Sequence, residues 1–273
     1  MKSRFPWLLI GGLFGILTGC GGGGSGSQAA SPARMDQPVK PTGGAPPAPS
    51  PGQSSDALQF HTPAPRAPSL PHDPADAAAL GTAGGFGDGA AVLVYADHQQ
   101  LRYVLLGRRS HWLRGSGHWG VFGGGVDPGD TDDAGQPSFS RAAEHELYEE
   151  SVSIYHQTDA MALRQCPSHL KTGAGGARYR TFFAAQPFIP ETRFNAGAAY
   201  ADQHLTAPGD RKYKENDQFL WVRLDDLIAC SQSGTDHGSF TDPQGHAHTL
   251  QLWSGFWRTL KEADFRQTLS RLP

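Results

Sequence analysis

The chain lacks the strongly basic charge of nucleic-acid-binding proteins and the long apolar run of a membrane-spanning helix. Charged residues make up 18% of its 273 residues, and the formal net charge is −3. A chain this close to neutral does not have the positive charge with which proteins bind along nucleic acid. It also has no basic stripe with interleaved aromatic residues. We therefore expect no nucleic-acid partner.

Cysteine is also scarce, with three residues, Cys20, Cys166 and Cys230. Cys20 follows an apolar stretch and has its own explanation below. Cys166 and Cys230 could form a disulfide if the chain is exported to an oxidising compartment. They could equally be two unpaired, buried thiols, and the sequence leaves both alternatives open.

The longest apolar stretch lies near the N-terminus, from Trp7 to Leu17, behind the positive residues Lys2 and Arg4. It is too short to cross a hydrocarbon core of ~30 Å as a helix. A short positive region followed by such a stretch is typical of a cleavable signal peptide, which we place at residues 1–19.

The stretch ends in Leu17-Thr18-Gly19-Cys20, which resembles the bacterial lipobox. The resemblance implies a lipoprotein whose Cys20 is acylated, for example with palmitate, and anchors the chain to a membrane. Gly21 stands where an inner-membrane retention signal would have Asp. This predicts a lipid-anchored protein of the cell envelope, on the outer membrane and facing the periplasm. The alternative is an ordinary signal peptide with a chance cysteine.

Residues 20–80 are rich in Gly, Pro and Ala and poor in large apolar residues. Such a segment cannot bury enough surface to offset the entropy of ordering it, so we predict a disordered tether. As a random coil it would span about 45 Å. The folded domain is predicted over residues 81–273.

Hydrophobic patterns predict a mixture of strands and helices in this domain. Ala142, Ala143 and Leu147 lie on one apolar stripe of a helix that begins at Ser138 or Ser140. The expected elements are a β-hairpin at 90–95 and 101–106, the helix at 138–152, strands at 179–185 and 219–222, a helix start at 224–227 and a terminal amphipathic helix at 250–272. The fold class is α/β (α+β).

Three glutamates gather on the central helix. Glu146 and Glu150 are four residues apart and share a helical face, and Glu149 lies beside them. Like charges at this spacing destabilise a bare helix, whereas a divalent cation bound by carboxylates removes the repulsion. The other interpretation is a solvated acidic face.

A glycine-rich segment, Gly123-Gly124-Gly125-Val126-Asp127-Pro128-Gly129-Asp130, precedes this helix. Together the two segments resemble the Nudix box, with Gly124 as its first glycine and Glu146, Leu147, Glu149 and Glu150 as its helical part. The flanking sequences around Gly107, Trp119 and Trp221 also fit. The resemblance covers residues 85–228. It implies a Nudix-type α/β/α sandwich with a mixed β-sheet.

The resemblance further implies a Nudix hydrolase. Such enzymes cleave a pyrophosphate bond in a nucleoside diphosphate linked to another moiety, with Mg²⁺ or Mn²⁺ as cofactor. The partner would be a small-molecule diphosphate substrate. The implied metal ligands are Glu146, Glu149, Glu150 and the Gly124 carbonyl, and the implied catalytic residues are Glu149 and Glu150.

Candidates outside the box follow from their positions. Family members often use a further carboxylate just before the strand that contains Trp221, so Glu215 is our first catalytic choice and Asp217 the second. Arg108 and Arg109 end the predicted hairpin and could bind substrate phosphates. A polar loop and a pair of surface charges are the alternatives.

The sequence also departs from the box. Asp130 stands where the box has Glu, His145 replaces an Arg, and Val152 replaces the closing Gly. The spacing is longer, so residues 132–138 should bulge out as a loop. These departures keep a second hypothesis open, a catalytically weak or inactive Nudix-fold module that binds a nucleotide-like ligand. A third is a structural envelope lipoprotein.

Two other clusters are not assigned a function. The histidines between Asp236 and His248 match no zinc-ligand spacing, and we predict a solvent-exposed loop there. Trp253, Phe256 and Trp257 are predicted to be core contacts of the last helix, and a base-stacking platform is the alternative.

Overall fold

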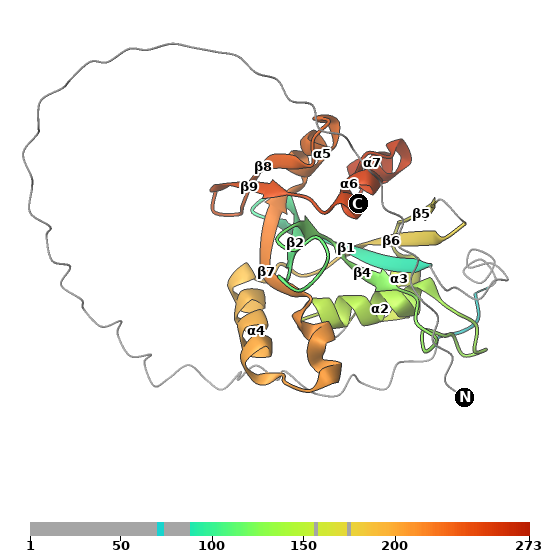
Figure 1. Ribbon diagram of the computed structural model, residues 1–273. Coiled ribbons are helices and arrows are strands. Elements are labelled where there is room, and N and C mark those ends of the chain that lie inside the picture. Colours follow the sequence, from blue (N-terminus) through green and yellow to red (C-terminus); the bar gives the residue numbers. More distant parts are fainter. Residues whose placement is uncertain (1–69, 74–87, 156–157, 174–175) are drawn as a thin grey trace, which may run out of the picture. The chain divides into compact units, whose positions relative to one another are not determined.

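The structure is a computed structural model that describes residues 70–73, 88–155, 158–173 and 176–273 (Figure 1). The predicted signal peptide, Cys20 and most of the predicted tether lie outside these residues. Among the described residues, no helix is both long enough and apolar enough to span a bilayer.

The described chain folds into strands and helices in the following order. The strands are β1 (Gly89–His98), β2 (Leu101–Arg109), β3 (Trp119–Gly120), β4 (Phe122–Gly125), β5 (Ser168–Thr172), β6 (Arg178–Ala185), β7 (Asn216–Arg223), β8 (His237–Thr241) and β9 (Ala247–Gln251). The helices are α2 (Phe139–Glu150), α3 (Ala160–Gln165), α4 (Glu191–His204), the 3₁₀-helix η1 (Pro208–Lys214), α5 (Leu224–Gln232), α6 (Ser254–Leu260) and α7 (Ala263–Ser270).

The main sheet is mixed and centres on β1. β1 pairs in parallel with β6 and antiparallel with β2 and β4. The first half of β1, from Gly89 to Val92, lies between β4 and β6. β7 and β3 then extend the sheet from β2, and β5 extends it from β6. The predicted hairpin and the strands at 179–185 and 219–222 are confirmed.

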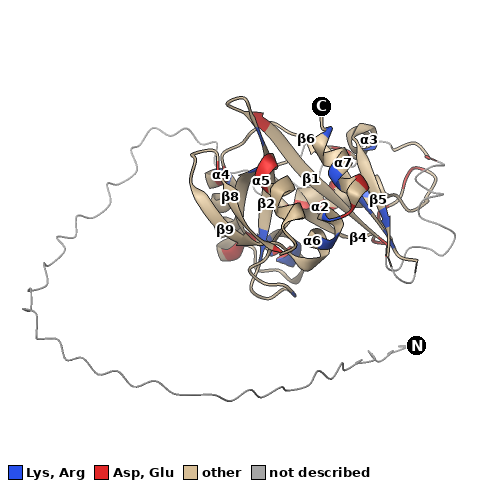
Figure 2. Ribbon diagram, turned by 90° about the horizontal axis from the view of Figure 1, so that it is seen from above, with Lys and Arg blue, Asp and Glu red and all other residues tan. Residues whose placement is uncertain are grey.

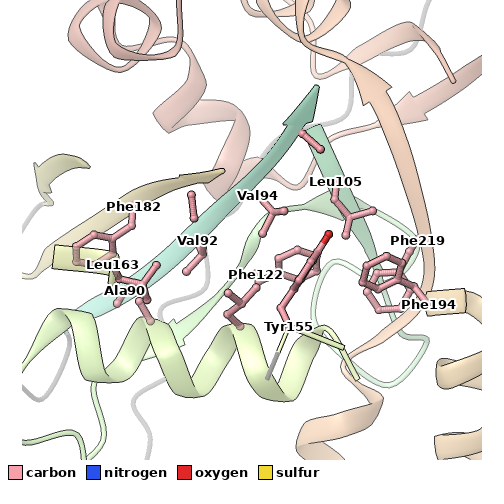
Figure 3. Packing of buried hydrophobic residues seen from close by; sticks show 14 of the residues in the cluster. Ala90, Val92, Val94, Leu105, Phe122, Tyr155, Leu163, Phe182, Phe194 and Phe219 are labelled. Carbon is pink, nitrogen blue, oxygen red and sulfur yellow. The ribbon is translucent and has the colours of Figure 1, made fainter. Parts of the chain in front are cut away.

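Helices cover both faces of this sheet, as Figure 1 shows. Alternate residues of β1 point to opposite faces. Ala90, Val92 and Val94 pack with α2 and α4 (Figure 3), whereas Leu93 and Tyr95 pack with α5, α6 and α7. The predicted α/β sandwich with a mixed sheet is confirmed.

Helix α2 begins where its sequence predicts. Ser138 is the N-cap, and its hydroxyl accepts a hydrogen bond from the Arg141 backbone amide at 3.4 Å. Phe139, Ala142, Ala143 and Leu147 are fully buried, so the predicted apolar stripe is confirmed. The helix ends before Val152, whose φ of 50° lies in the left-handed region.

The C-terminal part differs from the prediction. The predicted helix at 250–272 is instead the end of β9 followed by α6 and α7, with a break at Lys261 and Glu262. The predicted loop around the histidines is the hairpin β8–β9. The sequence does not reveal these two strands, because each buries only one large residue and so shows no apolar alternation. The buried residues are Phe240 in β8 and Leu250 in β9. Cys166 and Cys230 are free thiols, so the disulfide alternative is not realised.

Residues 70–73, which belong to the predicted tether, pack against the folded domain. Leu70 is fully buried, and its backbone amide donates to the Asp133 carboxylate at 2.9 Å. The Pro71 carbonyl accepts a hydrogen bond from Arg164 at 2.5 Å. The prediction of a structureless segment is therefore wrong for these four residues, because Leu70 finds an apolar site to bury.

The segment on which they pack is the predicted insertion at 132–138. It forms a tight turn, in which Asp132 accepts hydrogen bonds from the backbone amides of Ala134 and Gln136, both at 2.9 Å. Its other carboxylate oxygen lies 2.7 Å from His72. The insertion is thus a compact turn that holds residues 70–73.

Candidate active site

Two glycines of β4 allow side chains to approach the sheet closely from both faces. A Cβ at Gly124 would lie 2.2 Å from the Glu146 carboxylate, which comes from α2. A Cβ at Gly123 would lie 2.7 Å from the Tyr179 hydroxyl, which comes from β6. Only residues without a side chain leave room for both groups. The glycine-rich strand therefore brings an acid and a phenol to one place.

Glu150 is fixed beside the same glycines. Its side chain is 3% exposed and accepts a hydrogen bond from the Gly123 backbone amide at 2.7 Å. Burial, together with the charges of Glu146 and Glu215, raises its pKa well above the ordinary value. Burial and the same kind of repulsion raise the pKa of Glu146 to about 8.

Glu215 reaches this group from the end of η1, far along the chain. Its backbone carbonyl accepts from the Ser110 amide at 2.9 Å, which holds the segment against the end of β2. Burial raises the pKa of Glu215, and the nearby Arg109 opposes that rise. Three glutamates thus share one site, with Arg109 as a nearby cation.

A cavity of about 430 Å³ lies beside this group, and Glu215 is the one of the three glutamates that lines it. Arg109, Gly124 and Glu215 line it. The structure thus brings together a predicted substrate-binding residue, a predicted metal ligand and a predicted catalytic residue. Tyr179 and Trp253 also line it, and sequence reasoning missed both as site residues. No spacing pattern could place them there, since they come from β6 and from the residue before α6.

Trp253 and Arg109 are themselves in contact. The Arg109 guanidinium lies over the Trp253 ring, 4.9 Å from its centroid, and its Nε donates to the Arg114 carbonyl at 3.0 Å. Trp253 also packs at the edge of the core covered by α6. It therefore makes the predicted core contact and lines the cavity as well. Phe256 and Trp257 are buried in that core, as predicted.

Three predicted site residues, Glu149, Arg108 and Asp217, are already in ion pairs. Glu149 forms an ion pair with Lys212 at the end of η1. Arg108 pairs with Asp217 at 2.7 Å, and neither of these two residues lines the cavity. Of the two neighbouring arginines, the geometry therefore favours Arg109 for a ligand, and of the two extra carboxylates it favours Glu215.

His145 is held by the box residue Asp130. Its Nδ1 lies 2.5 Å from one Asp130 oxygen, while the other oxygen accepts from the Asp127 amide at 2.7 Å. Asp130 is 3% exposed, and its bond to His145 raises the pKa of the imidazole. Asp130 thus orders the loop before α2 and orients His145, which argues for a supporting role.

The glutamates fit a divalent cation by their chemistry. Carboxylate oxygens are the ligands that Mg²⁺ and Mn²⁺ prefer, and buried, mutually repelling carboxylates are stabilised by a bound cation. The carboxylate oxygens of the three glutamates do not, however, all lie within 4.8 Å of one another. Among the residues that the structure describes, only His169, Glu262 and Asp264 form a group of three whose ligand atoms lie within 4.8 Å of one another.

That second group lies at β5 and the start of α7. His169 is 3.1 Å from Asp264, and Glu262 is already paired with Lys171. This group shares no residue with the lining of the cavity over β4.

Comparison with known proteins adds three solved structures of low similarity. No family model and no curated protein matches the chain. It is similar to a Nudix hydrolase from M. smegmatis, RenU, with 18% identity, a TM-score of 0.39 and coverage of 68% of this chain and 87% of that one.

The Nudix domain of NrtR from Shewanella oneidensis, in complex with ADP ribose, has 17% identity and a TM-score of 0.37, with coverage of 72% and 94%. A Nudix hydrolase from Alicyclobacillus acidocaldarius has 16% identity and a TM-score of 0.35, with coverage of 70% and 98%. Scores this low carry no argument about activity or ligand, so the function rests on the site itself.

Proposed function

We propose that the domain is a Nudix-type pyrophosphohydrolase that cleaves a nucleoside diphosphate linked to another moiety, with Mg²⁺ or Mn²⁺ as cofactor. The observation that carries the proposal is the group formed by the buried Glu150 and the half-buried Glu146 and Glu215 beside the glycines of β4. The negative charge of this group is costly unless a cation binds there. The sequence resemblance to the Nudix box supports the same assignment.

The residues divide the work as follows. Glu146, Glu149, Glu150 and the Gly124 carbonyl would hold the cation, which supplies positive charge to the substrate phosphates when bound. Arg109 binds a phosphate oxygen from the cavity wall. Glu215 accepts a proton from the attacking water, a role that suits a carboxyl group whose pKa is raised by burial.

Hydrolysis by the full chain tests the proposal. Product release from a panel of dinucleotides and nucleotide sugars is measured with Mg²⁺, with Mn²⁺ and with EDTA. Glu150→Gln should lower the rate at least about 100-fold, since it removes a charge that acts on the reacting groups. Asp242→Asn is the matched control, because Asp242 is a buried carboxylate in the β8–β9 turn and not one of the three glutamates. Turnover that survives EDTA, or an unaffected Glu150→Gln, would refute the proposal.

A non-catalytic binding module is the second candidate. The ion pair between Lys212 and Glu149 favours it, because it occupies one of the proposed metal ligands. Calorimetry distinguishes the two candidates. Tight binding of a nucleotide without turnover, with either metal, would replace the enzyme by the binding module.

We also propose that the protein acts in the cell envelope, anchored by a lipid on Cys20. The support is the sequence Leu17-Thr18-Gly19-Cys20 alone, since these residues lie outside the described part of the chain. Labelling with radioactive palmitate should be lost in Cys20→Ser. Labelling that persists in this variant contradicts the anchor.

A further inference from the structure

The docked segment 70–73 is held on the inserted turn by reciprocal hydrogen bonds. The Leu70 amide donates to the Asp133 carboxylate at 2.9 Å, and the Asp133 amide donates to the Leu70 carbonyl at 2.8 Å. His72 lies 2.7 Å from the Asp132 carboxylate. The Leu70 side chain is fully buried. The segment thus docks through its main chain, a polar side chain and an apolar one.

Aspartates crowd the chain at this turn and just before it. Four of the seven residues 127–133 are aspartates, which Figure 2 colours red. Asp132 is buried, and burial of a carboxylate is costly unless hydrogen bonds or a positive charge complete it. The docked segment completes two of the four, because His72 lies beside Asp132 and the Leu70 amide donates to Asp133.

The turn is joined to the loop that precedes it. The Ser138 amide donates to the Asp130 carbonyl at 2.7 Å, and Thr131 forms an antiparallel β-bridge with Pro137. These two contacts close the turn at its base. The Asp130 carboxylate in turn accepts from the Asp127 amide at 2.7 Å. A shift of the turn would therefore move the loop before it as well.

This loop contributes to both the active-site cavity and the charge beside it. Asp127 and Pro128 line the cavity. Burial and the neighbouring glutamates raise the pKa of Glu146, and the charges of Asp130 and Asp127 add to the rise. The same negative charges attract a divalent cation. The position of the loop therefore sets part of the affinity of the proposed metal site.

A second contact connects the docked segment to helix α2. Arg164 of α3 donates to the Pro71 carbonyl at 2.5 Å, and its Nε donates to the Ser140 hydroxyl at 3.2 Å. Ser140 is a buried residue in the first turn of α2, the helix that carries the glutamates. Through Arg164 the segment is therefore connected to the helix of the site as well as to its loop.

We propose that residues 70–73 are positioning residues of the active site, which hold the loop at 127–131 where its aspartates add to the charge that binds the cation. This inference rests on the proposed function for the identity of the metal site. It also gives the insertion in the box a role, since the inserted turn is the surface on which the segment docks.

Two leucine-to-alanine variants of the full chain compare the docked segment with the core. Leu70 and Leu269 are both fully buried, and Leu269 lies in α7, on the face of the sheet opposite α2. Calorimetry with Mg²⁺ alone, well below the Tm of every variant, measures the Kd. Leu70→Ala should weaken Mg²⁺ binding about fivefold. Leu269→Ala should leave the Kd unchanged although it too loses buried contacts, and Leu70→Met, which keeps the volume, should bind like the wild type.

Amide hydrogen exchange locates the effect without using the metal. The amides of Asp132, Gln136 and Ser138 are hydrogen-bonded within the turn or to the loop before it. In Leu70→Ala and in His72→Ala they should exchange at least about tenfold faster, because the turn opens more often. The amides of the β8–β9 hairpin should exchange at the same rate in all variants.

Three outcomes would overturn the positioning role. They are Mg²⁺ binding by Leu70→Ala that equals that of the wild type, a loss of affinity in Leu269→Ala that equals the loss in Leu70→Ala, and unchanged exchange at the turn. Failure of the proposed function looks different. A chain that binds Mg²⁺ in a manner that depends on Leu70, yet hydrolyses no substrate, would refute the enzyme and support the positioning role.

Discussion

Two buried carboxylates in different regions of the molecule have opposite electrostatic surroundings. Asp242 in the β8–β9 turn is 4% exposed, and Glu150 at the end of α2 is 3% exposed. Burial alone would raise the pKa of both. Yet the pKa of Asp242 is lowered, whereas that of Glu150 is raised well above its ordinary value.

The hydrogen bonds explain the difference. Burial opposes ionisation of Asp242, but His248 donates to it at 2.8 Å and the backbone amides of Gln244 and His246 donate at 2.9 and 2.8 Å. Glu150 receives one backbone amide, from Gly123, and faces two other glutamates. Asp242 is thus satisfied within the protein, whereas on our proposal Glu150 is completed by a bound cation.

On our proposal, the comparison therefore separates a structural acid from a metal-binding one at similar solvent exposure. A carboxylate that caps a turn is completed by its own neighbours. A carboxylate whose neighbours are also acids destabilises the metal-free fold, and such arrangements persist where a ligand supplies the missing charge.

One large effect should come from exchanging each acid for its amide in the metal-free protein. Asp242→Asn should lower the free energy of unfolding by about 1–3 kcal/mol, because it weakens charge-assisted hydrogen bonds in a buried turn. Glu150→Gln should leave the stability unchanged or raise it, because it removes a repelling charge. Urea denaturation with EDTA measures both, and a loss of stability in Glu150→Gln that matches the loss in Asp242→Asn would erase the distinction.

A second effect should appear in the pH dependence of stability. The pKa of Glu146 is about 8 in the folded chain and has an ordinary value of 4.5. Between these values the folded state binds more protons than the unfolded state, so stability should fall as the pH rises from about 4.5 to about 8.

Thermal unfolding with EDTA at several pH values measures this fall. Mg²⁺ should raise the Tm more at pH 8 than at pH 5, since the cation replaces the lost protons. Glu146→Gln should flatten the metal-free profile. A metal-free Tm that rises over this interval would contradict the assignment.

The smallest effect concerns the glutamate that already has a partner. Lys212→Met frees Glu149, so the Kd for Mg²⁺ should become about two- to fivefold tighter, given that an exposed ion pair is worth up to about 1 kcal/mol. Lys214→Met is the control, because Lys214 donates to the Asp202 carbonyl rather than to a glutamate. Equal changes in the two variants would mean that the ion pair does not compete with the metal.

Local patterns carried the prediction of the fold where one face of an element is buried. The hairpin β1–β2 and the stripe of α2 are such cases, and both are confirmed. The terminal helix was wrong because Leu250 and Leu252 keep an apolar spacing while belonging to β9 and its end. Periodicity cannot distinguish a buried strand end from a helix over so few residues.

The glutamates of α2 could be predicted from the sequence, whereas Tyr179 and Trp253, which line the cavity, could not. The spacing of Glu146 and Glu150 places them on one face wherever the helix forms. Tyr179 and Trp253 enter the site through the pairing of β6 with β1 and the packing of α6, contacts that join distant segments. Such contacts leave no mark in the spacing of nearby residues, and one sequence alone cannot reveal them.

Val152 has a consequence for the order of events during folding. A β-branched residue in the left-handed region costs about 1–2 kcal/mol locally, so its φ of 50° must be held by the packing of its buried side chain against the core. We expect the last turn of α2 to settle only after that core has assembled. Glu149 and Glu150 would then reach their places late, so a half-folded chain would have no complete site with which to trap a metal ion.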